Sequence, residues 1–221
     1  MLWQTYDYFF ATDAGYFGAK KGAEPLHIQW NAATDAVEVV NYSDGDRPGL
    51  TARAEVLNID GSLKWEKTAP VDSREDSTIT PFRLEFPPGL ARTHFIRLTL
   101  LLDGKALSSN FYLHGLADED YQGIRSLPAV KVEAKTRVQR RGSQWLIATE
   151  LHNTSAAPAL MVRVKAVRER TGDPILPALY DDNYVAMMPG ERKTIHVELE
   201  NADTRGERPR ILIEGFNLAT H

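Results

Sequence analysis

The chain has 221 residues, with 26 basic and 30 acidic side chains, so its formal net charge at pH 7 is −4. The two signs are interspersed, which excludes the basic surface that nucleic-acid binding requires. The absence of cysteine excludes disulfides, thiolate metal sites and a cysteine nucleophile. Short basic clusters such as Arg140-Arg141 and Arg168–Arg170 alternate with acids and are interpreted as solvated strand or turn positions.

The first ten residues are rich in aromatic side chains: Trp3, Tyr6, Tyr8, Phe9 and Phe10. A chain terminus is normally polar and frayed, so this density indicates a surface that contacts a partner or belongs to a larger fold. A strand-like run there would otherwise leave an exposed apolar edge. We therefore expect residues 1–22 to be partly exposed, and to promote self-association, when that partner is missing.

A short helix of about ten residues is predicted to follow. Asp13 is a suitable N-cap, two lysines fall in the last turn, and Gly22 takes the position of a C′ glycine. Packing of this helix on the β-domain that follows it in sequence is the simplest account of Tyr16 and Phe17.

From Leu26 the hydrophobic period changes to two, and about seven short strands are predicted between Leu26 and His114. Alternate residues of 50–56 share one apolar face. The dipeptides Asp60-Gly61 and Asp103-Gly104 each separate two strand-like runs, which predicts hairpin turns. Strands at this spacing are typical of a β-sandwich.

An acidic stretch with glycine and proline then interrupts the alternation and is interpreted as a linker. A second set of about seven strands follows it, so the sequence predicts an all-β protein with two tandem sandwiches. The expected segments are 1–22, 23–117 for the first sandwich, 118–128 for the linker and 129–221 for the second sandwich. The chain shows neither a signal peptide nor an apolar run long enough to span a membrane.

The sequence contains no recognisable catalytic apparatus. Asp118, Glu119 and Asp120 are consecutive, and consecutive side chains point apart, so they make a poor catalytic pair. Oxygen ligands at Asp181-Asp182-Asn183 suit a hard cation, but the loop lacks the spaced ligands of a dedicated site and a structural turn is favoured. The six histidines have no metal-ligand spacing, and no nucleotide-binding or nucleophile-elbow motif occurs. We therefore expect no catalytic residue, no cofactor and no metal.

Two stretches carry a resemblance to a known family. Trp3, Asp7, Tyr8 and Phe9, followed by the helix segment 15–22 and EPLHIQW, resemble the end of the catalytic barrel in glycoside hydrolase family 2. ILPALYDDNYVAMMPGE resembles a signature of the terminal immunoglobulin-like domain in the same enzymes. The similar branch holds exo-β-D-glucosaminidases, β-mannosidases and mannosylglycoprotein endo-β-mannosidases.

The resemblance implies that residues 1–22 are a remnant of a (β/α)₈ barrel and that both sandwiches are immunoglobulin-like. It implies a retaining glycosidase whose two catalytic carboxylates lie upstream of Met1, so that this chain lacks them. The implied partners are the chain's own catalytic barrel and an oligosaccharide substrate, and the implied location of the parent enzyme is periplasmic or secreted. Residues that would lie near the substrate cleft are Trp3, Asp7, Tyr8, Tyr180, Asp182, Asn183 and Tyr184.

Two other classes of function remain open. A stand-alone carbohydrate-binding module would use aromatic faces to stack on sugar rings, but Trp30, Trp65 and Trp145 lie in strands where burial is the default. An adhesin-like interaction protein shares the tandem sandwich architecture, yet it offers no account of residues 1–22.

Overall fold

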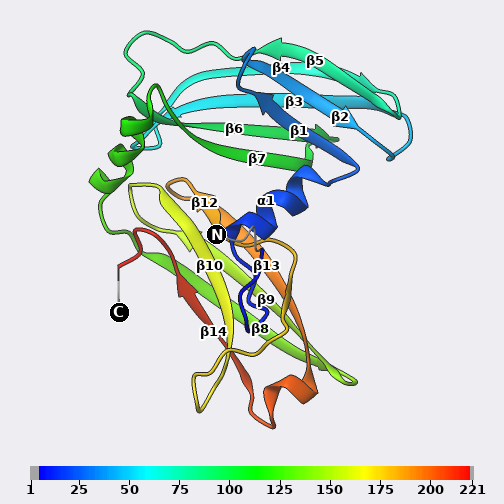
Figure 1. Cartoon of the computed structure of the whole chain (residues 1–221), viewed down its shortest axis with the longest axis vertical. Coiled ribbons are helices and arrows are strands. Elements are labelled where there is room, and N and C mark those ends of the chain that lie inside the picture. The colour runs from blue at the N-terminus through cyan, green and yellow to red at the C-terminus, as the bar shows by residue number, and fades with distance from the viewer. Residues whose placement is uncertain (1–4, 220–221) are drawn as a thin grey trace. The chain divides into compact units, whose positions relative to one another are not determined.

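The computed structural model describes residues 5–219, which divide into two compact units (Figure 1). One unit comprises residues 19–127 and holds the first sandwich. The other comprises the second sandwich, from residue 128 onward, together with the N-terminal segment up to Gly18. The aromatic N-terminus thus belongs with the sandwich that is farthest from it in sequence.

Seven antiparallel strands form the first sandwich within the described residues. One sheet has the order β4-β3-β6-β7 and the other has the order β1-β2-β5. The strands are β1 (Leu26–Asn31), β2 (Ala36–Asn41), β3 (Arg47–Asn58), β4 (Leu63–Ser73), β5 (Ser77–Arg83), β6 (Thr93–Leu102) and β7 (Lys105–Gly115). Each sheet turns one face inward, as the period of two predicts.

The core of this sandwich follows from the alternation along its strands. On β3, Leu50, Ala52, Ala54 and Val56 are all at most 1% exposed, and they face the apolar side chains of the opposite sheet. Complete burial of one large aliphatic side chain contributes about 1.5–3 kcal/mol relative to leaving it in water. The turn from β6 to β7 has φ of 50° at Asp103 and 75° at Gly104, as a two-residue type I′ hairpin requires.

The segment interpreted as a linker forms a 3₁₀ helix, η1 (Asp118–Ser126), which packs against β6 and β7. Asp120 accepts a hydrogen bond from the backbone N–H of Ala117 at 2.9 Å and pairs with Arg92 at 2.7 Å. Gly123 lies directly against Thr93, with no room for a Cβ atom. This segment is therefore an ordered part of the first unit.

Seven antiparallel strands of the described chain likewise form the second sandwich. Its sheets have the orders β11-β13-β9-β8 and β12-β10-β14. The strands are β8 (Val132–Arg141), β9 (Gln144–Asn153), β10 (Ala159–Arg168), β11 (Leu179–Tyr180), β12 (Val185–Met187), β13 (Arg192–Glu200) and β14 (Pro209–Glu214), and a short 3₁₀ helix, η2 (Asn201–Thr204), follows β13. The predicted all-β fold of two sandwiches is confirmed.

Helix α1 (Ala14–Gly22) begins after the predicted N-cap, because the Oδ1 atom of Asp13 accepts the backbone N–H of Tyr16 at 3.0 Å. Phe17 is only 4% exposed, and its ring centroid lies 5.9 Å from that of Tyr184 in the second sandwich. Packing of Phe17 on the first sandwich was therefore the wrong expectation. No helix within residues 5–219 is long and apolar enough to cross a membrane.

Candidate functional site

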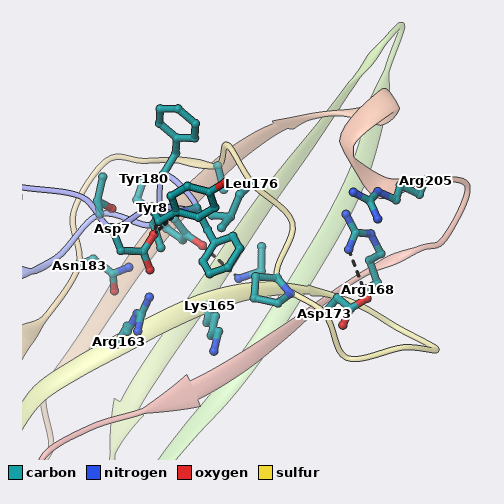
Figure 2. Close-up of a pocket in the computed structure, with 17 residues that line it drawn as sticks. Asp7, Tyr8, Arg163, Lys165, Arg168, Asp173, Leu176, Tyr180, Asn183 and Arg205 are labelled. Atoms are coloured by element: carbon teal, nitrogen blue, oxygen red, sulfur yellow. Dashed lines mark hydrogen bonds and ion pairs between the residues drawn. The ribbon is translucent and has the colours of Figure 1, made fainter.

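The N-terminal segment and the second sandwich together enclose a pocket of about 870 Å³ (Figure 2). One side is formed by residues 7–12, and the floor is formed by β10. The remaining lining comes from the loop 173–183 and from Arg205, which follows η2. A volume of this size is within the usual range for small-molecule sites.

The strand β10 sets the chemistry of the floor. Val162, Val164 and Ala166 point into the core and are at most 1% exposed, so Arg163 and Lys165 point to the other face. Both cations lie near Glu214 of the neighbouring strand β14, at 3.7 and 3.6 Å respectively. The floor is thus positively charged, with one carboxylate for two cations.

The loop before β12 is pinned to β10 by two side chains that the resemblance singled out. Asn183 is 4% exposed, and its amide accepts the N–H of Val164 at 2.8 Å and donates to the carbonyl of the same residue at 2.9 Å. The Tyr180 hydroxyl accepts the N–H of Ala166 at 3.0 Å, and burial raises its pKa. Both residues line the pocket, but these polar groups hold the loop in place.

The two acids of the same loop turn toward β13. The carboxylate of Asp181 accepts the backbone N–H of His196 at 2.8 Å and lies 2.7 Å from Nδ1 of the His196 ring. Asp182 pairs with Lys193 at 2.7 Å. Neither acid lines the pocket, and no cluster of three or more metal-ligating side chains occurs in the described part of the chain. The favoured interpretation of this stretch as a structural turn agrees with these contacts.

Tyr184 connects the loop to the N-terminal segment. Its hydroxyl donates to the carbonyl of Thr12 at 3.3 Å, its ring packs near Phe17, and the Arg163 guanidinium lies 5.3 Å from the ring centroid. Burial raises the pKa of the Tyr184 hydroxyl, an effect that the positive charge of Arg163 opposes. Tyr184 therefore serves as a docking point for residues 12–17.

The N-terminal segment folds into a tight turn over the pocket. Oδ1 of Asp7 accepts the backbone N–H groups of Phe9 at 2.8 Å and Ala11 at 3.0 Å, and Tyr6 forms a β-bridge with Thr12. Asp7 and Tyr8 both line the pocket, whereas Trp3, the remaining cleft candidate, lies outside the described residues. The turn leaves Tyr8 89% exposed.

The pocket has two ends that differ in chemistry, as Figure 2 shows. Asp7 and Tyr8 lie by Tyr180 and Asn183 at one end, which we call the aromatic end. Arg168, Asp173 and Arg205 lie at the other, which we call the arginine end. Residues of the aromatic end were predicted from the sequence, whereas none of the arginine end was.

Arg168 was interpreted as a solvated residue, but it is only 7% exposed. Its Nη2 donates to the backbone carbonyl of Asp203 at 2.9 Å, and its Nη1 lies 3.6 Å from the Asp173 carboxylate. The alternation of side chains along β10 could have predicted this burial. Residue 168 lies two positions after Ala166 and four after Val164, so it belongs to the core-facing side of the strand.

Comparison with known proteins now identifies the fold. Residues 110–218 match the family described as the exo-β-D-glucosaminidase Ig-fold domain. The match covers 109 of the 221 residues, and this part of the chain is similar to that Ig-fold domain. The expected resemblance to the glucosaminidase and mannosidase branch of glycoside hydrolase family 2 is confirmed.

Two relatives and one solved structure show the extent of the similarity. An exo-β-D-glucosaminidase from Streptomyces avermitilis is 32% identical over 98% of this chain, and the match covers 27% of that protein. A mannosylglycoprotein endo-β-mannosidase from Lilium longiflorum is 23% identical over 98% of this chain and is covered over 29% of its length. The crystal structure of Amycolatopsis orientalis exo-chitosanase CsxA is similar to this chain, with a TM-score of 0.89 and 29% identity. The match covers 99% of this chain and 28% of the CsxA chain. This chain thus spans about a quarter of the length of its curated relatives.

Proposed function

We propose that this chain is the non-catalytic accessory region of a larger retaining glycosidase, and that it packs on and supports a catalytic barrel. The observation that carries the proposal is the N-terminal turn. Tyr8, Phe9 and Phe10 are 89%, 67% and 66% exposed, although their backbone is held in a defined turn by Asp7. Adjacent exposed aromatics that are held rigidly in this way mark a surface that a partner covers.

The partner that fits this surface is a barrel that precedes it in the same polypeptide. Relatives of the chain are about four times its length, so each has room for further domains. Because the turn is anchored through Thr12 and Phe17 to Tyr184, a barrel attached to the turn would be held against the second sandwich. In a (β/α)₈ barrel the active site lies at the carboxyl ends of the strands, near the last strand-to-helix connection.

The chemistry of glycoside cleavage is assigned to the missing part of the enzyme. A retaining mechanism needs two carboxyl groups about 5 Å apart, one of which acts as nucleophile. The pocket here contributes two carboxylates from its lining, Asp7 and Asp173. Asp7 accepts two backbone hydrogen bonds and Asp173 pairs with Arg168, so each has a structural partner. The proposed substrate of the parent enzyme is an oligosaccharide with a terminal β-linked glucosamine or mannose.

The loop 180–184 supports the cleft indirectly under this proposal. Tyr180 and Asn183 direct their polar groups to β10, and Asp182 directs its carboxylate to Lys193. Tyr184 belongs to the same loop and donates a hydrogen bond to the N-terminal segment. The loop therefore positions residues 7–17, and Asp7 and Tyr8 are the cleft candidates that a sugar in the parent enzyme would reach.

A stand-alone carbohydrate-binding module is the second candidate, and the exposed Tyr8 at the mouth of a pocket favours it. The tryptophans do not help, because Trp30, Trp65 and Trp145 pack against the two cores. Calorimetric titration of the purified chain with glucosamine and mannose oligosaccharides separates the two functions. The accessory role predicts no heat of binding at millimolar ligand.

A chimera tests the proposed role. This chain replaces the matched quarter of the Streptomyces avermitilis exo-β-D-glucosaminidase, and the chimera is expected to fold and retain glucosaminidase activity. The double substitution Tyr8→Ser and Phe9→Ser is then expected to lower the Tm of the chimera by several degrees. The matched control is Tyr42→Ser on the first sandwich, where the side chain is 74% exposed. Equal Tm values for the two variants would contradict a covered surface at the N-terminal turn.

A further inference from the structure

The charges that line the pocket are unevenly compensated. Arg163 and Lys165 share the carboxylate of Glu214, and Arg163 also lies over the Tyr184 ring. At the arginine end, Arg168 and Arg205 have a single carboxylate in the lining, that of Asp173. The Asp173 carboxylate lies 3.6 Å from Nη1 of Arg168, and the Asp173 side chain is 62% exposed. This distance is longer than that of a charge-assisted hydrogen bond, which is about 2.7–2.9 Å.

Arg168 is held rigidly and is incompletely satisfied. Its guanidinium is fixed between the end of β10 and the carbonyl of Asp203 in η2. Its Nε atom has no hydrogen-bond partner among the described residues. Most buried polar atoms have such a partner, and an exception is typical of a site that binds an ion or water or has another functional role.

Arg205 brings a second guanidinium to the same end of the pocket. It caps the C-terminus of η2 in a left-handed conformation with φ of 53°, and its backbone N–H donates to the carbonyl of Ala202. Asp203, whose carbonyl receives Arg168, lies two residues earlier, and Figure 2 shows both guanidinium groups at one end of the pocket. Two like charges at one end of the pocket repel each other, and an anion bound there in addition to Asp173 would offset that repulsion.

We propose that the arginine end of this pocket binds an oxyanion, such as the sulfate, phosphate or carboxylate group of a small ligand, between Arg168 and Arg205. Guanidinium groups bind such anions through paired, planar hydrogen bonds. Tyr8 and Tyr180 at the aromatic end present surfaces for a ring attached to the anion, so an acidic sugar is the ligand class that uses the whole pocket. A glucosamine unit carries an ammonium group, which the two guanidinium groups of the arginine end repel.

The oxyanion site stands independently of the accessory function, because Arg168 and Arg205 both belong to the second sandwich. It is tested on the purified 221-residue chain by calorimetry and thermal unfolding with inorganic sulfate at about 10 mM, against chloride of the same ionic strength. Sulfate is expected to raise the Tm of the native chain and of the control Arg170→Gln. The side chain of Arg170 is 84% exposed and lies outside the pocket lining. Arg205→Gln is expected to weaken sulfate binding at least tenfold.

Two further measurements make the outcome decisive. The Nε–H resonance of Arg168 in a ¹H–¹⁵N spectrum is expected to shift on addition of sulfate in the native chain, and to remain unchanged in Arg205→Gln. D-glucuronate is expected to bind more tightly than acetate if the ring contacts the aromatic end, whereas equal binding assigns the site to the free oxyanion. An identical Tm response in the native chain and Arg205→Gln, or no heat with any of these anions, would overturn the site.

Discussion

The hydroxyl of Tyr184 donates to the carbonyl oxygen of Thr12, which lies 172 residues earlier in the chain. This bond joins the two stretches on which the family resemblance rests, and the ring of Tyr184 adds a contact with the buried Phe17. The aromatic N-terminus and the loop before β12 are therefore two sides of one structure, the pocket of the second sandwich.

Tyr184→Phe is expected to loosen the N-terminal segment without unfolding the second sandwich. The substitution removes one partly buried hydrogen bond, worth about 0.5–1.5 kcal/mol, and keeps the ring contact with Phe17. Amide hydrogen exchange should therefore accelerate in residues 5–18 while the amides of β9 and β13 keep their protection. Tyr184→Ala, which also removes the ring, should accelerate it further. Unchanged exchange in both variants would show that Tyr184 does not hold the segment.

Asn183→Ala is expected to destabilise the second sandwich strongly. The amide is buried and satisfies both the N–H and the carbonyl of Val164, so its removal leaves two backbone groups without partners. We expect a loss of about 3 kcal/mol in urea unfolding, since an unsatisfied buried group costs about 1–3 kcal/mol. The neighbouring Asp182→Ala removes a partly exposed ion pair with Lys193 and should cost less than about 1 kcal/mol. Equal losses in the two variants would be inconsistent with this assignment.

His94 and His114 should make the first sandwich sensitive to acid. Nδ1 of His114 lies 2.9 Å from Nε2 of His94, whose Nδ1 is in turn 2.9 Å from the carbonyl of Ala91. Burial lowers the pKa of both histidines. The charge of His94 lowers the pKa of His114 further, and the nearby Asp35 opposes that shift. A lowered pKa means that the unfolded chain binds more protons, so this contribution is present above about pH 6.5 and is lost as the pH falls through the folded pKa values.

Urea unfolding of the native chain between about pH 7 and pH 5 measures this sensitivity. The midpoint should fall with pH in the native chain and should fall less in His114→Gln. His196→Gln, at an exposed position in the second sandwich, is the control and should retain the native dependence for the first sandwich. A native-like pH dependence in His114→Gln would exclude the histidine pair as its source.

Substitution by alanine is expected to change stability in opposite directions at two glycines. A Cβ atom at Gly123 would lie 2.1 Å from Oγ1 of Thr93, so Gly123→Ala must displace η1 from β6 and should lower stability by about 1–3 kcal/mol. Gly18 lies inside α1 with no atom within 4 Å of the added carbon, so Gly18→Ala should stabilise by about 0.5–1 kcal/mol. Thermal unfolding of the two variants gives the comparison. A loss of stability in Gly18→Ala would show that the space beside the helix is needed.

Local patterns predicted most of the fold. The alternation along 50–56 identifies a strand with one buried face, Asp103-Gly104 predicts the hairpin turn, and Asp13 predicts the start of α1. These features depend on neighbours in sequence. The partner of Phe17 was predicted wrongly, because the contact with Tyr184 depends on two segments far apart in the chain.

The site was predicted only in part, for a related reason. Family resemblance led to Asp7, Tyr8 and Asn183, all of which line the pocket. The charge of Arg168 suggested that it is solvated. It is buried instead, because it lies on the core-facing side of β10 and donates a hydrogen bond to a backbone carbonyl of η2. Arg205 reaches the pocket through a left-handed backbone conformation that the sequence does not reveal.

The most direct test of the non-catalytic role is the rate at which the purified, folded chain hydrolyses a chromogenic β-D-glucosaminide. The account predicts a rate equal to that of a protein-free control, because it assigns the catalytic carboxylates to the proposed barrel and not to this chain. Hydrolysis that is lost on substitution of Asp7 or Asp173 by alanine would contradict it.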